Sequence, residues 1–214
     1  GYEEGEWWVQ DYSSQIPVTL LNIKPEDEVL DLCAAPGGKT AQLISLGAKV
    51  TSIDDNKKRI LRMEQNLKRL NYKSNIKNEN IKNFSTKESW SKIILDAPCS
   101  STGTLRKNPE IIHQKKESDI FSLAKLQSDL LDASWGLLKE NGILIYCTCS
   151  MEKEEGEYQI ESFLKRKKDS ILDKINTQEI DKKLKIIDKN KWLRIFPNSF
   201  DFNGGNDGFF IARI

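Results

Sequence analysis

The sequence predicts an α/β fold, a three-layer sandwich around a mostly parallel sheet that is completed by a C-terminal antiparallel hairpin. Short apolar runs typical of buried strands alternate along the chain with segments of helical periodicity. Three of the apolar runs end in polar or reactive residues, at Cys33, Asp96 and Cys149. The carboxyl ends of parallel strands meet at one edge of a sheet, where open α/β folds bind ligands. We therefore expect these three residues to gather at that edge.

Strands are predicted where Val, Ile and Leu gather in short runs between turn residues. The strands of the parallel part are residues 28–33, 50–53, 74–77, 93–95 and 143–147. Two later runs, 192–196 and 209–214, flank a turn rich in Asn and Gly at 203–206, which predicts the hairpin. A dinucleotide-binding Rossmann domain normally ends on parallel strands, so the hairpin is the distinguishing element of this pattern.

Helices that cover the sheet are predicted from apolar residues at helical spacing. In residues 58–70 the apolar positions recur every three to four residues and leave a basic outer face. The other predicted helices are one within residues 1–17, then 40–46, 123–138 and 152–168. The helix over 123–138 is marked by repeated leucines and is expected to close near Asn141 and Gly142.

Two segments follow neither periodicity. Residues 99–118 are polar and carry Gly103 and Pro109, which predicts a long functional loop. Residues 169–191 are rich in lysine and only loosely patterned.

Length and composition favour one intracellular domain. A chain of 214 residues is long enough to bury one substantial core. No apolar stretch approaches the length of a membrane span, and no signal peptide opens the chain. The four cysteines lack the spread of a secreted disulfide framework, which favours a reducing compartment and a cytoplasmic protein. The net charge of +1 does not decide for or against a nucleic-acid partner. A single histidine, His113, nearly excludes histidine-based triads and His-rich metal sites.

A glycine-rich turn, Ala35-Pro36-Gly37-Gly38-Lys39-Thr40, follows one predicted strand and precedes a helix. Glycines let the backbone approach a ligand closely, and a helix N-terminus favours a negative group. A P-loop requires glycine at position 33, where this chain has cysteine, and the Gly-x-Gly-x-x-Gly fingerprint of dinucleotide sites is absent. S-adenosylmethionine requires only a tight turn, an acid for its ribose and a partner for its adenine. Asp54, at the end of the next strand, suits the ribose. A helix entry without any ligand is the alternative.

The cysteines at the ends of two strands form the second candidate site. Cys147 and Cys149 point the same way on a strand, with Cys149 nearer the sheet edge. A lone cysteine in such a place is more often a small buried hydrophobe. Here both Cys99 and Cys149 precede a serine, and Cys99 follows Asp-Ala-Pro, which favours a reactive pair. A zinc site built from all four cysteines is the rival, but it lacks a Cys-x-x-Cys knuckle and a nearby histidine, so no metal is expected.

Three motifs in order carry a resemblance to a known family. They are Asp31-Leu32-Cys33-Ala34-Ala35-Pro36-Gly37-Gly38-Lys39-Thr40, Asp96-Ala97-Pro98-Cys99-Ser100 and Thr148-Cys149-Ser150. Shorter matches are Val9-Gln10-Asp11, Gly103-x-x-Arg106-x-x-Pro109 and Asp207-Gly208-Phe209-Phe210. Over nearly its whole length the chain resembles the Sun/nucleolar-protein family of RNA (cytosine-5) methyltransferases, and most of all its bacterial 16S ribosomal RNA members. The resemblance implies a class I S-adenosylmethionine-dependent methyltransferase fold, which is Rossmann-like.

The resemblance also implies the roles of individual residues. The methionine end of S-adenosylmethionine would be held by Cys33, Ala34, Ala35, Pro36, Gly37, Gly38 and Lys39. Asp54 would hold the ribose, and Asn80 takes the place of an aspartate that the family usually has near the adenine. Asp96 would lie near both the cofactor and the target base. Cys149 would be the nucleophile, and Cys99 would help to release the product.

The implied activity is the transfer of a methyl group from S-adenosylmethionine to carbon 5 of a cytosine in RNA, through a covalent cysteine adduct. Carbon 5 of cytosine is a weak nucleophile, and a thiolate added to carbon 6 activates it. The thiolate is the attacking form, so a lowered pKa is expected for Cys149. Arg106 and Lys107, in the loop after Cys99, are expected to contact phosphates near the target base.

Two other kinds of function remain alternatives. The first is a non-catalytic RNA-binding or ribosome-assembly protein on the same fold, although such a protein has no need for both cysteines, Asp96 and the glycine turn. The second is a methyltransferase that acts on DNA cytosine or on protein. DNA cytosine enzymes carry their nucleophile in a Pro-Cys motif, which here is Pro98-Cys99.

We expect residues 1–214 to form one catalytic domain, as a fragment that lacks an N-terminal RNA-binding domain, since family members often carry one and this chain begins at glycine. The expected partner is RNA, with ribosomal RNA first, and neither a membrane nor a second copy of the chain.

Overall fold

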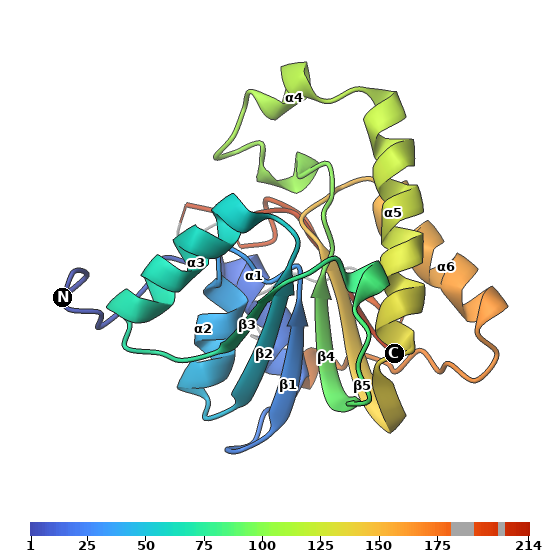
Figure 1. The fold of residues 1–214 in the computed structure, drawn as a ribbon. Coiled ribbons are helices and arrows are strands. Elements are labelled where there is room, and N and C mark those ends of the chain that lie inside the picture. The colour runs from blue at the N-terminus through green and yellow to red at the C-terminus, as the bar shows by residue number, and fades with distance from the viewer. Residues whose placement is uncertain (181–190, 201–203) are drawn as a thin grey trace.

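The computed structural model describes residues 1–180, 191–200 and 204–214, and it contains one seven-stranded sheet in the order β3-β2-β1-β4-β5-β7-β6 (Figure 1). The strands are β1 (Glu28–Leu32), β2 (Lys49–Asp54), β3 (Asn75–Asn78), β4 (Trp90–Asp96), β5 (Leu138–Thr148), β6 (Leu193–Ile195) and β7 (Phe209–Arg213). The first five run parallel, and β7 runs antiparallel to both β5 and β6. The predicted mostly parallel sheet with a C-terminal antiparallel pair is therefore confirmed.

Apart from the short helix Ile111–Gln114, which lies beyond the ends of the strands, the helices form two layers on opposite faces of the sheet (Figure 1). They are α1 (Tyr12–Leu20), α2 (Gly38–Ser45), α3 (Lys57–Arg69), α4 (Ile111–Gln114), α5 (Glu117–Trp135) and α6 (Glu157–Arg166). Short 3₁₀ helices occupy Ile81–Asn83, Thr102–Thr104, Lys153–Glu155 and Thr177–Glu179. The residues of α1 and α2 pack with one face of the sheet, and those of α5 and α6 pack with the other. This is the predicted three-layer sandwich.

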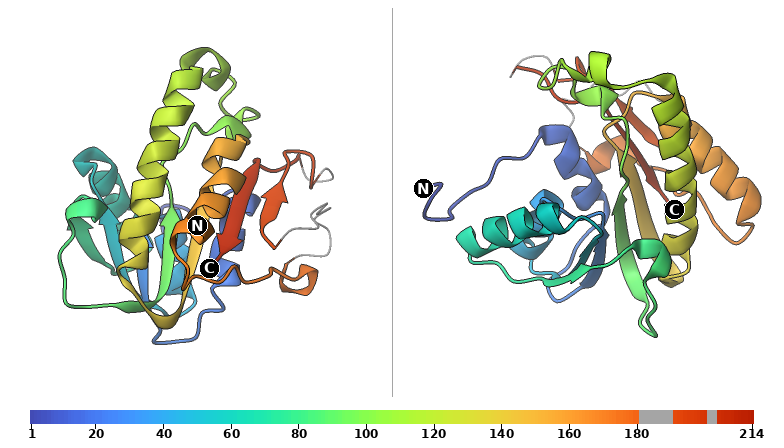
Figure 2. Two further views of the ribbon diagram at one scale, coloured as in Figure 1. Left: turned by 90° about the vertical axis from the view of Figure 1, so that its right-hand side faces the viewer. Right: turned by 45° about the horizontal axis from the view of Figure 1, so that its top comes forward.

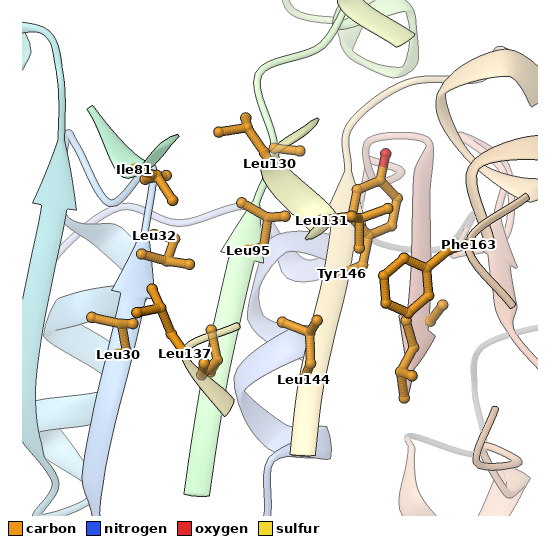
Figure 3. Packing of buried hydrophobic residues seen from close by; sticks show 14 of the residues in the cluster. Leu30, Leu32, Ile81, Leu95, Leu130, Leu131, Leu137, Leu144, Tyr146 and Phe163 are labelled. Atoms are coloured by element: carbon orange, nitrogen blue, oxygen red, sulfur yellow. The ribbon is translucent and has the colours of Figure 1, made fainter. Parts of the chain in front are cut away.

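Alternation along the strands divides the core between the two faces. On β1, Leu30 joins the cluster under α5 and α6, while its neighbour Val29 joins the cluster under α1 and α2. Figure 3 shows Leu131 of α5 and Phe163 of α6 among the residues of the first cluster. Strands buried on both faces need continuous apolar runs, which is why the sequence pattern located them.

Several element boundaries differ from those predicted from the sequence. Helix α5 ends at Trp135, and Asn141 and Gly142 lie inside β5 rather than after a helix. They occupy an irregular stretch of that strand, in which the pairing with β4 shifts and Asn141 takes a positive φ of 58°. Helix α6 begins only at Glu157, because a 3₁₀ turn comes first and Gly156 has non-helical backbone angles.

Two expectations concern segments that are only partly described. Residues 181–190, within the loosely patterned stretch, and residues 201–203, at the predicted hairpin turn, lie outside the described residues. The predicted loop 99–118 is described throughout and contains both a 3₁₀ helix and α4. Figure 2 shows the α4 segment beyond the ends of the strands and the β6–β7 pair at one side of the sheet.

The topology brings the ends of four strands to one edge of the molecule. From β1 the chain order runs outward in one direction through β2 and β3, and in the other direction through β4 and β5. The point between β1 and β4 is thus the switch point of the sheet, where α/β folds open a crevice at the carboxyl ends of their strands. The segments that follow β1, β2, β4 and β5 meet there.

Candidate active site

Two free thiols lie side by side at the switch-point edge. Cys99 follows β4 and Cys149 follows β5, and their Sγ atoms are 3.5 Å apart. The Cys149 thiol also lies 3.5 Å from the hydroxyl of Ser101. The two strands are adjacent and parallel, so residues at the same distance beyond their ends meet. Both cysteines are partly accessible to solvent, as a reactive thiol must be.

The contact between the two thiols shifts their pKa values in opposite directions. A hydrogen bond from the Cys99 thiol to the Cys149 sulfur lowers the pKa of Cys149, against the opposing effect of burial. The same hydrogen bond, together with burial, raises the pKa of Cys99. One proton is therefore retained on Cys99, and Cys149 is the thiol that ionises first. Cys147 is completely buried, and burial raises the pKa of its thiol, so it is no nucleophile.

An ion pair stands beside the thiols. The Lys39 ammonium, from the start of α2, lies 2.7 Å from a carboxylate oxygen of Asp96 at the end of β4. Burial disfavours the charge on Lys39, but the Asp96 carboxylate outweighs it and raises the pKa of the lysine. The ammonium also lies 5.3 Å from the centre of the Phe209 ring, which packs the last motif of the chain against the site. Asp96 accepts a further hydrogen bond from the Cys147 thiol at 3.6 Å.

The glycine turn is shaped by backbone conformations that few residues adopt. Gly37 begins α2 with a φ of 97°, where any side chain would also meet Met63. Cys33, just before the turn, has a φ of 59°, which is uncommon for a residue with a side chain. Asp54, at the end of β2, is nearly buried and accepts a hydrogen bond from the Ala35 amide at 3.1 Å. The turn and this carboxylate thus form one unit.

Asn80 lies apart from this unit, on the surface after β3. Its side-chain oxygen accepts a hydrogen bond from the Lys82 amide at 3.0 Å and so caps a 3₁₀ helix. Its amide nitrogen donates to a carboxylate oxygen of Asp55 at 3.3 Å. Asp55 directly follows Asp54, so Asn80 is linked to the β2 end through its neighbour.

Gly103 allows the loop after Cys99 to pass close to the backbone of Cys149. Its amide donates to the Cys149 carbonyl oxygen at 2.9 Å, and its own carbonyl accepts from the Gly208 amide at 2.8 Å. A methyl group at this position would clash with the Gly208 carbonyl oxygen and lie 2.8 Å from that of Cys149. No side chain fits between these three backbone segments.

Arg106 and Lys107 lie beside two carboxylates. The Lys107 ammonium lies 2.5 Å from Asp11 and 2.9 Å from Asp207. Arg106 stands farther off, at 3.5 Å and 3.7 Å from the same two carboxylates. This cluster, which we call the rim cluster (Asp11, Arg106, Lys107 and Asp207), joins three short motifs from distant parts of the chain.

Sequence reasoning missed one group at the site, the buried carboxylate of Glu155. Its side chain contacts Ser100, the residue after Cys99. Glu155 stands in an acidic run, Glu152 to Glu157, within the helix predicted over residues 152–168. The only hint was Gln127, a polar residue on the apolar face of α5, which donates to Glu155 at 3.0 Å.

Two kinds of feature are absent. In residues 1–180, 191–200 and 204–214, no group of three or more His, Cys, Asp and Glu side chains is arranged to hold a metal ion. Over the same described residues, no helix is both long enough and apolar enough to span a bilayer.

The arrangement has the parts of a site for covalent catalysis. It holds a thiol that ionises readily, a second thiol to carry a proton, and a carboxylate fixed by a buried ammonium. A glycine turn with a carboxylate one βα unit later lies at the same edge.

Known proteins are similar to this chain in sequence and in fold. A family model described as 16S rRNA methyltransferase RsmB/F matches residues 18–214. The chain is 40% identical to ribosomal RNA small subunit methyltransferase B of Photorhabdus laumondii, over 100% of this chain and 48% of that protein. It is 42% identical to the protein of the same name from Escherichia coli, over 84% of this chain and 43% of that one. The chain therefore spans about half the length of the curated relatives it matches.

Solved structures of other proteins are also similar to this chain in fold. NSun6 from Pyrococcus horikoshii, crystallised with SFG, superimposes with a TM-score of 0.84 at 29% identity, over 99% of this chain and 53% of that one. A methyltransferase homolog protein from the same organism gives a TM-score of 0.78 at 29% identity, over 99% of this chain and 68% of that one.

Proposed function

Because the chain belongs to the RsmB/F family of 16S rRNA methyltransferases, we propose that it transfers a methyl group from S-adenosylmethionine to carbon 5 of a cytosine in 16S rRNA. The observation that carries the proposal is the pair of thiols, Cys99 and Cys149, whose sulfur atoms are 3.5 Å apart. Cytosine methylation at carbon 5 needs one thiol to add to the ring and a base to remove a proton, and two adjacent thiols of unequal acidity supply both.

Cys149 is the nucleophile in this proposal. Its thiolate adds to carbon 6 of the cytosine, which makes carbon 5 electron-rich enough to accept a methyl group. The lowered pKa of Cys149, caused first by the hydrogen bond from Cys99, supports this choice. Carbon 6 is approached from the face that stacking covers, so the target base must be unpaired or flipped out.

Cys99 is the base in this proposal. While Cys149 is a thiolate, its negative charge contributes to keeping the proton on Cys99. Once Cys149 is bonded to carbon 6 that charge is gone, so Cys99 ionises more easily and can accept the proton from carbon 5. The carbon–sulfur bond then breaks, and Cys149 is released as a thiolate.

Asp96 recognises the target base by a hydrogen bond in this proposal. A carboxylate paired with an ammonium accepts hydrogen bonds, and the exocyclic amino group of cytosine is a donor. The Lys39 partner thus favours an accepting role for Asp96 at the amino group over a donating role at nitrogen 3. Uracil carries an acceptor in the same place and is disfavoured.

The glycine turn and Asp54 fit S-adenosylmethionine. The positive φ of Gly37 opens the backbone at the start of α2, and the Asp54 carboxylate at the end of β2 is suited to ribose hydroxyls. The NSun6 relative was solved with SFG, an analogue of this cofactor. Residues 33–39 would hold the methionine end, Asp54 the ribose, and Asn80 would lie near the adenine. When bound, the cofactor supplies an electrophilic methyl group.

Titration calorimetry with S-adenosylmethionine tests the cofactor. Wild type is expected to bind, and Asp54→Ala to lose binding. Because Asp54 also accepts from the Ala35 amide, Asp54→Asn serves as a second variant that keeps one acceptor oxygen. Binding that is unaffected in both variants would remove Asp54 from the cofactor site.

Methyl transfer from tritium-labelled cofactor to unmodified 16S rRNA tests the reaction. Wild type is expected to produce 5-methylcytosine, and Cys149→Ala to produce none while still binding cofactor. Methylation at full rate by Cys149→Ala would refute the role of this thiol. Uridine placed at the target position is expected to remain unmethylated.

We also propose that residues 1–214 form the catalytic domain of the protein, that it works as a monomer in the cytoplasm, and that a further RNA-binding part guides it to its site. Family membership and the four free cysteines support this setting. Sedimentation at increasing concentration tests the monomer, and a concentration-dependent dimer would contradict it.

A further inference from the structure

Glu155 is a carboxylate without solvent contact that lies behind the two thiols. Its side-chain oxygens accept hydrogen bonds from the Ser100 amide, at 2.9 and 3.2 Å, and from the Ser100 hydroxyl. Gln127 donates a further bond from α5 at 3.0 Å. Burying a carboxylate costs several kcal/mol unless its oxygens accept good hydrogen bonds. The donors on Ser100 and Gln127 therefore stabilise the buried Glu155 carboxylate.

The serines extend this contact to both cysteines. Ser100 directly follows Cys99, Ser150 directly follows Cys149, and their hydroxyl oxygens are 3.1 Å apart. All of these hydrogen bonds are buried or nearly so. The two Cys-Ser pairs are therefore held against each other from behind.

Glu155 itself is anchored to β5. Its backbone carbonyl accepts from the Tyr146 hydroxyl at 2.8 Å and from the Thr148 hydroxyl at 3.2 Å. The side chain of Glu155 thus pulls the loop after β4 toward the end of β5, where Cys149 stands.

We propose that Glu155 is a positioning residue that keeps the Cys99 thiol against Cys149, so that Cys99 can reach the carbon-5 proton of the covalent intermediate. The inference rests on the proposed function. It assigns Glu155 first to product release, because its contacts run to Ser100 and hence to Cys99, and to the attack only through the hydrogen bond from Cys99 that lowers the pKa of Cys149.

Glu155 supports the step that restores the aromatic ring of the cytosine and frees Cys149. In the methylated intermediate, carbon 5 carries a hydrogen and a methyl group, and carbon 6 is bonded to the Cys149 sulfur. Cys99, which is partly accessible, first gives its own proton to solvent. Its thiolate then takes the hydrogen from carbon 5 as a proton, and the electrons of that bond form the carbon 5–carbon 6 double bond. The carbon 6–sulfur bond breaks, and its electrons leave on Cys149.

The variant Glu155→Gln tests the proposal with little change in volume. An amide can still accept from the Ser100 amide and Gln127 at the position of Oε1, but it places a donor nitrogen where Oε2 accepts from the Ser100 hydroxyl and from the Ser100 amide at 3.2 Å. Glu154→Gln is the matched control, since it makes the same change one residue earlier at a side chain partly open to solvent. Thermal unfolding and binding of S-adenosylmethionine establish that both variants are folded.

With unmodified 16S rRNA and S-adenosylmethionine, Glu155→Gln is expected to accumulate a covalent protein–RNA complex on denaturing gels, and to release product about 10 to 100 times more slowly than wild type. Glu154→Gln is expected to behave as wild type. Slower turnover without accumulation of the complex would overturn the proposal, as would wild-type turnover of Glu155→Gln.

A second variant covers the case in which Glu155→Gln does not fold. Ser150→Ala removes the link between the two serines and keeps Glu155 with Ser100. This variant is expected to accumulate the same covalent complex to a smaller extent than Glu155→Gln. Absence of the complex in Ser150→Ala would count against the proposal.

Alkylation of Cys149 by iodoacetamide gives a readout without RNA. Loss of the Cys99 donor from its place is expected to move the pH midpoint of Cys149 alkylation upward in Glu155→Gln and not in Glu154→Gln. If wild type methylates no RNA and Cys99→Ala forms no complex, the proposed function fails, while this shift still decides whether Glu155 positions Cys99. An unchanged midpoint would contradict that positioning.

Discussion

At the scale of single residues, the chemistry depends on how two identical side chains are made different. The thiols of Cys99 and Cys149 lie 3.5 Å apart, and their contact raises the pKa of Cys99 and lowers that of Cys149. Their positions in the chain were predictable, since each follows a buried strand. Their unequal acidity was not, because it arises from a contact between residues 50 positions apart.

The pH dependence of Cys149 alkylation tests this inequality. A thiol whose pKa is lowered stays reactive to a lower pH than an ordinary thiol, whose pKa is about 8.5. Cys99→Ala removes the donor and is expected to shift the alkylation midpoint of Cys149 upward. Cys99→Ser keeps a donor and is expected to shift it less. Mass spectrometry of the alkylated peptide measures the reaction at Cys149. Equal midpoints in wild type and Cys99→Ala would contradict the statement that the hydrogen bond from Cys99 lowers the pKa of Cys149.

Asp31 is a second residue whose surroundings decide its charge. It is fully buried on β1, where burial raises its pKa to about 7, and it accepts a hydrogen bond from the Thr40 hydroxyl at 2.6 Å. The folded state thus holds a proton that the unfolded chain releases near pH 4. Stability from this group is full below that pH and is lost as the pH rises through about 7.

Asp31→Asn is expected to remove this dependence. Relative to wild type, the variant gains free energy of unfolding of about 2 kcal/mol between pH 5 and pH 7, since one proton released per pH unit corresponds to about 1.4 kcal/mol. Urea denaturation at several pH values measures the gain. Asp129→Asn, on the exposed side of α5, is the control. A gain that does not grow with pH would show that Asp31 is already ionised at pH 5.

At the scale of elements, each strand and most helices were predictable because apolar periodicity is local. The end of α5 was not, because Leu137 and Leu138 continue the leucine pattern of the helix although Leu138 already belongs to β5. Asn141 and Gly142 resemble a helix stop, yet they occupy an irregular stretch inside β5. Only pairing with β4 decides between these readings, and pairing is not a local property.

The loop after β4 depends on one glycine. Gly103→Ala introduces a methyl group that clashes with the Gly208 carbonyl and lies 2.8 Å from the Cys149 carbonyl oxygen. Such overpacking against backbone is expected to cost about 1–3 kcal/mol in thermal or urea unfolding and to impair methyl transfer. Gly136→Ala, at the end of α5 with 3.4 Å to its nearest neighbour, is expected to be tolerated. Equal stability of the two variants would mean that the three segments do not meet as described.

At the scale of the whole molecule, the rim cluster connects the N-terminal segment, the loop after β4 and the start of β7. The ion pairs of Lys107 were not predictable from the sequence, because its two acidic partners stand about 100 residues away on either side in the chain. Burial opposes ionisation of Asp11, but the hydrogen bond from Lys107 lowers its pKa, and burial raises the pKa of Asp207. Lys107 thus offsets the repulsion of two poorly hydrated carboxylates.

Lys107→Ala is expected to destabilise the fold mainly near neutral pH. The lowered pKa of Asp11 means that its contribution is present above about pH 4 and lost as the pH falls further. Since Lys107 is partly exposed, the expected loss is about 1 kcal/mol at pH 7 and less at pH 4. Lys82→Ala, which breaks an exposed pair with Asp129, is the control for urea denaturation. A loss that is greater at pH 4 would contradict the pairing.

In the proposed reaction, Cys149 makes the bond to RNA and Cys99 ends it. The most direct measurement is to incubate Cys99→Ala with unmodified 16S rRNA and S-adenosylmethionine, digest the covalent complex, and locate the modified peptide by mass spectrometry. We expect the nucleotide on Cys149, and no complex in the double variant that also carries Cys149→Ala. If Cys99→Ala turns over normally without a complex, or if Cys149→Ala forms a complex through Cys99, the roles assigned to the two thiols are wrong.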